Sequence, residues 1–221
     1  MGMGFPFDSR EMLGDLSFMQ TIFRWPRKLK ANSFTLVELL VVISIIGLLA
    51  ELAVPAIQGG LDKAKQQVDV SNARQCGLIS FSYANDNDGN FNGTNAAFTS
   101  SRDYFTNLIS LGLLNSAKIL GGNGFTAATS TNNIQPANVA WAYNNPLTTS
   151  DDGMLPLFLS KNAGTTISSN ISLASATNGW KSKGIVVYRV GQSAEFIKSD
   201  SSKNVVLGVT NNATGASITS Q

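Results

Sequence analysis

The feature that most constrains this chain is one long apolar stretch, Phe34 to Val54, which has the sequence FTLVELLVVISIIGLLAELAV. It is 21 residues long and carries two charges, Glu38 and Glu51. An α-helix rises about 1.5 Å per residue, so the stretch reaches about 30 Å, the depth of a bilayer's hydrocarbon core. A carboxylate at mid-membrane costs at least about 2.5 kcal/mol, so its presence there calls for a reason. The stretch predicts a single transmembrane helix in which Glu38 has a specific purpose.

The flanks of this stretch predict its orientation and its end. Four basic residues stand just before it: Arg24, Arg27, Lys28 and Lys30. Basic flanks stay on the cytoplasmic side, so the N-terminus is expected inside and the rest of the chain outside. Residues 1–33 are predicted to be a leader peptide, with an uncleaved cytoplasmic tail as the alternative. Pro55 is expected to kink the helix near residue 51, because proline has no amide hydrogen to donate.

The run from Ser33 to Ile43, SFTLVELLVVI, resembles the N-terminal cleavage and methylation motif of type IV pilins and type II secretion pseudopilins. In that family a prepilin peptidase cuts before a Phe, which is then N-methylated, and a Glu follows four residues later. The resemblance implies cleavage between Ser33 and Phe34, N-methylation of Phe34, and an assembly role for Glu38. Pro55 falls where many members carry a kinking proline. The chain departs from the family at Ser33, where the family has Gly.

The resemblance also implies a function and a location. It implies a structural subunit of a type II secretion pseudopilus or a type IV pilus, held in the bacterial inner membrane with its C-terminal domain periplasmic or extracellular. The implied partners are prepilin peptidase, other pilin or pseudopilin subunits in a homo-oligomeric filament, the secretion or pilus assembly machinery, and membrane lipid. The pseudopilus is favoured slightly, because one cysteine cannot close the disulfide of many pilins and Tyr83–Asn90 resembles a pseudopilin turn. The alternative is a membrane-anchored extracytoplasmic binding module that does not polymerise.

Composition excludes several other classes. The chain has no histidine, which removes the commonest general base and metal ligand, and no Gly-rich phosphate loop, so neither an enzyme nor a cofactor is predicted. Cys76 is the only cysteine and is expected to be a small buried residue. A net charge of +2 is too small to indicate a nucleic acid partner. Asp86 and Asp88 are weak metal candidates, because the other ligands of a calcium loop are missing.

The rest of the chain predicts an α+β fold, in which a long N-terminal helix packs on a C-terminal antiparallel sheet as in pilins. The helix should continue to about residue 84 and stop at the turn Asn85–Asn90, and residues 61–221 should form the extracytoplasmic domain. Trp141 and Trp180 are expected to be core or rim aromatics. Pro156 indicates an edge position for its strand. Further segments are predicted as follows: a short helix within 100–114, strands at 139–143 and 154–159, a polar loop at 160–179, and an antiparallel meander of strands at 184–190, 194–198 and 205–209.

Overall fold

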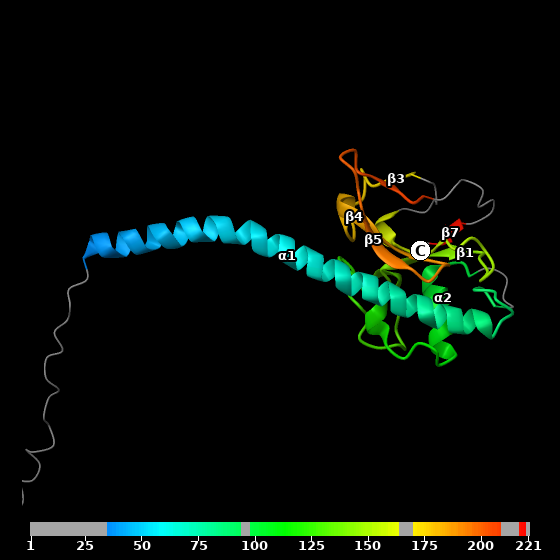
Figure 1. The fold of residues 1–221 in the computed structure, drawn as a ribbon. Helices are drawn as coiled ribbons and strands as arrows, with labels where there is room; N and C mark the ends of the chain where they lie inside the picture. The colour runs from blue at the N-terminus through cyan, green and yellow to red at the C-terminus, as the bar shows by residue number, and fades with distance from the viewer. Residues whose placement is uncertain (1–34, 94–97, 164–169, 209–216, 220–221) are drawn as a thin grey trace, which may run out of the picture. The chain divides into compact units, whose positions relative to one another are not determined.

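The structure is a computed structural model, and it describes residues 35–93, 98–163, 170–208 and 217–219. The chain divides into two units, Met1–Val54 and Pro55–Gln221, which we describe separately. Helix α1 (Leu36–Asn85) has residues in both units, and helix α2 (Ser101–Ser110) follows it (Figure 1). Four short 3-10 helices complete the helical part of the described residues: Ala117–Leu120, Pro136–Asn138, Lys161–Ala163 and Lys181–Lys183.

Helix α1 ends where the sequence becomes rich in Asn, Asp and Gly. The amide of Gly89 donates to the carbonyl of Ala84 with an N···O distance of 2.8 Å. Asp88 and Gly89 both have positive φ, 54° and 80°. Left-handed backbone of this kind costs little at Gly and is tolerated by Asp and Asn, so these residue types stop the helix and reverse the chain. The turn predicted at Asn85–Asn90 is confirmed.

The main sheet is antiparallel and contains five described strands in the order β5-β4-β2-β1-β7, with β5 at one edge. A second, two-stranded antiparallel sheet pairs β3 with β6. The long apolar helix and the antiparallel sheet confirm the predicted α+β, pilin-like fold. The strand bounds are β1 Trp141–Asn145, β2 Pro156–Ser160, β3 Asn170–Ser172, β4 Gly184–Arg189, β5 Ala194–Lys198, β6 Asn204–Val206 and β7 Ser217–Thr219.

The main sheet is buried on both faces. Tyr143, Phe158 and Tyr188 belong to one core cluster with residues of α1 and α2. Their strand neighbours point the other way, and Leu159 and Val187 belong to a second cluster with residues of β3 and β6. Figure 1 shows α2 and β3 on opposite sides of this sheet. Every residue of β1, β2 and β4 is therefore buried, and the apolar residues of these strands run consecutively instead of alternating with polar ones. The polar residues stand at the strand ends: Asn144, Asn145, Ser160 and Arg189.

Small residues let helix α1 lie close to the sheet. The buried face of α1 includes Ala73, Cys76, Gly77, Ser80 and Ala84, so the predicted burial of Cys76 is confirmed. A Cβ atom at Gly77 would lie 2.0 Å from Cζ of Tyr188, well inside van der Waals contact. The ring of Tyr188 thus occupies the space that a side chain at this position would need.

A buried carboxylate also holds α1 in place. Asp69 of α1 is 6% exposed, and its Oδ2 accepts hydrogen bonds from the indole Nε1 of Trp180 at 2.8 Å and from the amide of Asn123 at 3.0 Å. Burial raises the pKa of Asp69 above its usual range, although the two hydrogen bonds act in the opposite direction. Trp141 and Trp180 are 1% and 2% exposed, which confirms them as core aromatics.

The edge position expected for the strand of Pro156 is wrong. Strand β2 is the third of five and pairs with both β1 and β4. Pro156 is accommodated because it is the first residue of β2, and the register with β4 shifts between Pro156 and Phe158. A proline at the start of a strand or beside a bulge removes no ladder hydrogen bond that the sheet requires.

The predicted three-stranded meander is also wrong. Strands β4 and β5 do form the expected hairpin, but β6 leaves this sheet and pairs with β3, inside the segment predicted to be a polar loop. Val205 of β6 and Ile171 of β3 are buried against the second face of the main sheet. Covering that apolar face stabilises the structure more than a third hairpin strand at the edge would, because the face would otherwise remain in water.

Candidate assembly site at the start of helix α1

The described part of the site begins with Thr35 and Glu38. Oε2 of Glu38 accepts hydrogen bonds from the amide nitrogen and from Oγ1 of Thr35, both at 2.8 Å. The amide of Glu38 donates back to Oγ1 of Thr35 at 3.2 Å. This reciprocal pair is a capping box, which satisfies amides that have no partner within the helix. The T-x-x-E pattern is visible in the sequence, but sequence reasoning selected Glu38 alone and missed Thr35.

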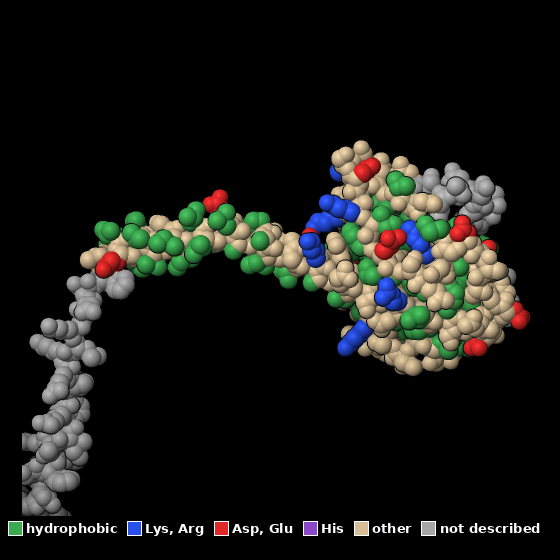
Figure 2. Space-filling model, in the orientation of Figure 1, with side chains coloured by type: hydrophobic (Ala, Val, Ile, Leu, Met, Phe, Trp, Pro, Cys, Tyr) green, Lys and Arg blue, Asp and Glu red, His purple; other side chains and the backbone are tan. Residues whose placement is uncertain are grey.

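An exposed apolar surface follows this box. The large hydrophobic side chains from Leu36 to Val54 are all about half exposed or more, from 47% at Val42 to 79% at Leu36, and Figure 2 shows them covering the segment. The one polar hydroxyl within it, Oγ of Ser44, donates to the carbonyl of Leu40 at 2.7 Å, so its hydrogen bond is made inside the helix. Among the described residues, α1 is the one helix long and apolar enough to span a membrane.

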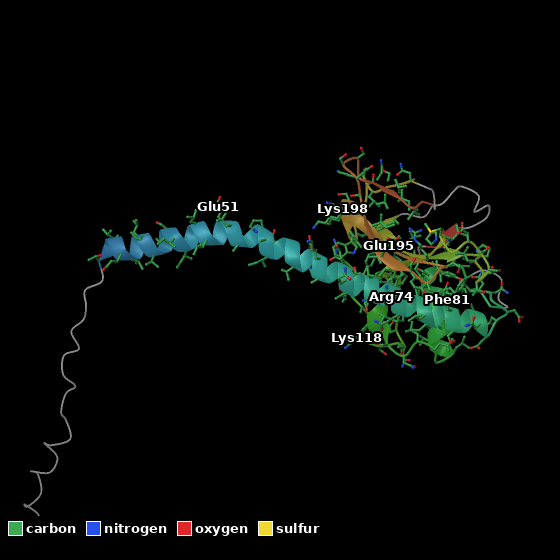
Figure 3. All side chains as sticks on the ribbon, viewed as in Figure 1. Glu51, Arg74, Phe81, Lys118, Glu195 and Lys198 are labelled. Carbon is green, nitrogen blue, oxygen red and sulfur yellow. The ribbon has the colours of Figure 1, made fainter. Side chains whose placement is uncertain are left out.

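The far end of the apolar surface contains Glu51 and Pro55. Glu51 is exposed, and Figure 3 shows its side chain on the outside of the helix. Pro55 lies inside α1 and cannot donate to the carbonyl of Glu51, four residues earlier. The helix kink expected at Pro55 stays a prediction.

The residues of the predicted cleavage step lie outside the described residues. These are Ser33 and Phe34, together with the rest of the proposed leader. Cleavage between them and N-methylation of Phe34 stay predictions that rest on the sequence motif.

Asp86 and Asp88 lie exposed in the turn after α1. In the part of the chain that the structure describes, no group of three or more Asp, Glu, Cys or His side chains could hold a metal ion. The weak metal hypothesis for these two residues therefore gains no further ligand from the fold.

One family model matches the part of the chain that contains this site. Residues 28–50 match the family model for the prokaryotic N-terminal methylation motif, which is the signature of type IV pilins and pseudopilins. The match includes the end of the basic flank, the Thr35–Glu38 capping box and most of the apolar stretch. No curated protein and no solved structure matches the chain.

The fold is pilin-like, the motif is the signature of type IV pilins and pseudopilins, and helix α1 has the length and apolar composition of a membrane anchor. The motif implies processing by a prepilin peptidase and assembly with pilin-type subunits, and the proteins that carry it are structural and not enzymatic. The recognition made from the sequence is thus confirmed at the level of the motif.

Proposed function

We propose that this chain is a structural subunit of a type II secretion pseudopilus or a type IV pilus. It is inserted in the bacterial inner membrane with its N-terminus in the cytoplasm, cut by prepilin peptidase between Ser33 and Phe34, and assembled into a helical filament that serves secretion. The observation that carries this proposal is the Thr35–Glu38 capping box at the head of an exposed apolar helix, inside the matched motif. The lone buried Cys76 favours the pseudopilus, because it cannot form an intramolecular disulfide.

The proposed chemistry concerns the partner of Glu38. Cleavage creates a new α-amine on Phe34, directly before the capping box, and N-methylation leaves that amine able to carry a positive charge. An unpaired carboxylate in the apolar core of a filament would be costly. The amine of Phe34 in a neighbouring subunit compensates it and fixes the axial register, a buried ion pair that acts for specificity. Both hydrogen bonds from Thr35 use Oε2, so the proposal assigns Oε1 to the neighbour's amine.

The test is the mass of the mature chain. Expression in a host with prepilin peptidase should yield a protein that lacks residues 1–33 and begins at N-methyl-Phe34. A Ser33→Gly variant, which restores the family's residue, should be processed at least as fast. If only this variant is cut, the assignment to the family stands and Ser33 limits cleavage. If neither chain is cut, the proposal is wrong.

One observation favours a second candidate, a membrane-anchored binding module that does not polymerise. A groove of about 530 Å³ lies along α1 in the unit of residues 55–221, with Leu61, Val68 and Phe125 among its apolar lining residues. A groove of this size and character suits a small apolar ligand or peptide side chain. Retention of the N-terminal Met and failure to form multimers in a host that assembles other pilins would favour this candidate.

A further inference from the structure

Lysines gather where helix α1 enters the unit of residues 55–221. Lys63 and Lys65 lie on α1, Lys183 precedes β4, and Lys198 ends β5; all four are exposed, and we call them the entry lysines. Lys63, Lys183 and Lys198 line one hollow of about 700 Å³ together with Asp62 and Asp200. Nζ of Lys183 lies 2.5 Å from a carboxylate oxygen of Asp62, which lowers the pKa of Asp62 and ties this end of β4 to α1. Four lysines and two aspartates give this end a net charge of +2.

Carboxylates gather at the opposite end of this part of α1. Asp86 and Asp88 lie in the turn after the helix, and the loop with Asp151 and Asp152 lies beside that turn, because the amide of Thr149 donates to the carbonyl of Gly89 at 2.8 Å. All four carboxylates are exposed, and none forms an ion pair with a described residue. Their charge is −4, and the helix from Lys63 to Asn85 separates the two ends by about 33 Å.

This separation matters more than the total charge. Residues 55–221 contain 11 basic and nine acidic residues, a net charge of +2, which is too small to steer the unit as a whole. The two ends differ by six charges, and Figure 2 shows Lys and Arg side chains gathered over the region of this unit that includes the entry of α1. The unit is therefore electrically asymmetric along α1, and a charged surface would orient it.

The entry lysines are kept near the membrane by the chain itself. Lys63 is the ninth residue after Val54, which is about 14 Å of helix, and a bend at Pro55 could only bring Lys63 closer to the bilayer. The headgroup layer extends about 5–8 Å beyond the hydrocarbon core, and the Debye length is about 8 Å at physiological ionic strength. The entry lysines thus come within electrostatic reach of the headgroups whenever residues 36–54 span the bilayer.

We propose that the entry lysines bind the anionic headgroups of the outer leaflet while the subunit resides in the membrane. The acidic end is repelled by the same headgroups, so the unit is held with its lysine end toward the lipid. Each lysine near an anionic surface strengthens such contact about fivefold. The proposal depends on insertion of the apolar helix and not on filament assembly. The acidic end of a second copy would also attract the entry lysines. The apolar helix, however, holds the entry lysines next to the bilayer and not next to a second copy.

The test uses the full chain, one copy per lipid nanodisc, with discs of phosphatidylcholine alone or mixed with phosphatidylglycerol. A donor dye is attached at Ser201→Cys beside the entry lysines or, as the control, at Ser150→Cys beside the acidic end, and native Cys76 is buried and shielded from the reagent. Energy transfer to an acceptor on the lipid headgroups reports proximity. Transfer from position 201 should rise with phosphatidylglycerol and fall in 1 M salt, where the Debye length is about 3 Å, and transfer from position 150 should not rise.

Variants separate the entry lysines from charge in general. Lys63→Gln with Lys65→Gln and Lys198→Gln should return transfer from position 201 to its value in neutral discs, and Lys183 is left in place because it pairs with Asp62. Arg74→Gln removes a cation farther along α1, away from the entry lysines, and should leave transfer unchanged (Figure 3). The proposal would be overturned if energy transfer from position 201 does not change with phosphatidylglycerol or salt, or if it falls equally in the Arg74 control variant. Because single chains in discs cannot assemble, neither result bears on the filament proposal.

Discussion

At the scale of single residues, the contact between α1 and the main sheet depends on one position without a side chain. We predict that Gly77→Ala destabilises the protein by about 1–3 kcal/mol, because the new Cβ would lie 2.0 Å from the ring of Tyr188 and the core would have to shift. Chemical unfolding of the full chain in detergent, followed by tryptophan fluorescence, measures the loss.

Gly60→Ala is the matched control, because it lies on the same helix and a Cβ there meets nothing within 4 Å. It should leave the free energy of unfolding unchanged or raise it by about 0.4–1 kcal/mol, since alanine restricts the unfolded chain and favours a helix. Helix propensity favours alanine at both positions, so an equal loss in both variants would contradict the assignment of the loss at position 77 to the ring of Tyr188.

The buried carboxylate of Asp69 makes a separate, pH-dependent contribution. Its folded pKa is raised above the unfolded value of 3.8, so the folded state holds the proton more tightly. The stability that this difference supplies is complete below the unfolded pKa and is lost as the pH rises through the folded pKa. We predict that Asp69→Asn, which keeps an oxygen to accept from Trp180 and Asn123, removes this component.

The measurement is the difference in unfolding free energy between Asp69→Asn and the parent, followed from about pH 3 to pH 7, a range that brackets the usual pKa of Asp. The unfolding free energy of the variant should rise relative to that of the parent as the pH rises. Carboxyls whose pKa is lowered, such as Asp62 and Asp103, give the opposite slope in both proteins and cancel in the difference. If the unfolding free energy of the parent instead rises relative to that of the variant with increasing pH, the raised pKa of Asp69 is contradicted.

At the scale of elements, Glu38 at the start of α1 caps the helix in the single chain, and in the proposed filament it also pairs with the amine of a neighbouring subunit. We predict that Glu38→Leu inserts in the membrane at least as well as the parent, because it removes a charge from the span. Its filament yield, normalised to inserted protein in sheared or cross-linked fractions, should fall at least about tenfold, as expected if about 1.4 kcal/mol of pairing is lost per contact.

Two controls accompany this variant. Thr35→Ser retains the hydroxyl of the capping box and should assemble normally. Glu51→Gln changes the second acid of the stretch and should have the milder effect, because the proposed orientation puts Glu51 near the outer boundary, where it can reach water. Normal filaments from Glu38→Leu, or a larger loss from Glu51→Gln, would contradict the role assigned to Glu38.

Elements specified by nearby residues were predictable from the sequence. Helix α1, its terminal turn and the β4–β5 hairpin all follow from the pattern of neighbouring residues. Glu38 was identified because a carboxylate within a membrane span is costly, so its presence indicates a function. The pairing of β3 with β6 was not predictable, since both strands are three residues long and gain their stability from the sheet they cover. Nor could sequence spacing join Lys183 to Asp62 or Trp180 to Asp69, which are 121 and 111 residues apart.

At the scale of the whole molecule, the two units should be separable. Both core clusters draw their buried residues from Ala73 onward, and none comes from the apolar segment before Pro55. We predict that a fragment of residues 55–221 folds as a soluble monomer with a cooperative thermal transition, and that a fragment starting at Leu61 behaves alike. Calorimetry and sedimentation measure both properties.

A fragment of residues 86–221 is the matched control. It lacks α1, so Phe158 and Tyr188 lose the helix that covers them, and it should aggregate or melt without cooperativity. Cooperative melting of this fragment would show that the sheet does not need the helix, and aggregation of the longer fragments would show that the membrane segment is required for folding.

Strand β5, at the edge of the main sheet, bears on how closely these molecules can be crowded. An open strand edge is a template on which another chain can add its own strand, and such fusion is hard to reverse. Strand β5 is five residues long and carries Glu195 and Lys198, both exposed (Figure 3). Charges on a short edge make the addition of an apolar strand unfavourable. This edge of the sheet therefore resists fusion with the sheet of a neighbouring copy, even where copies are crowded together.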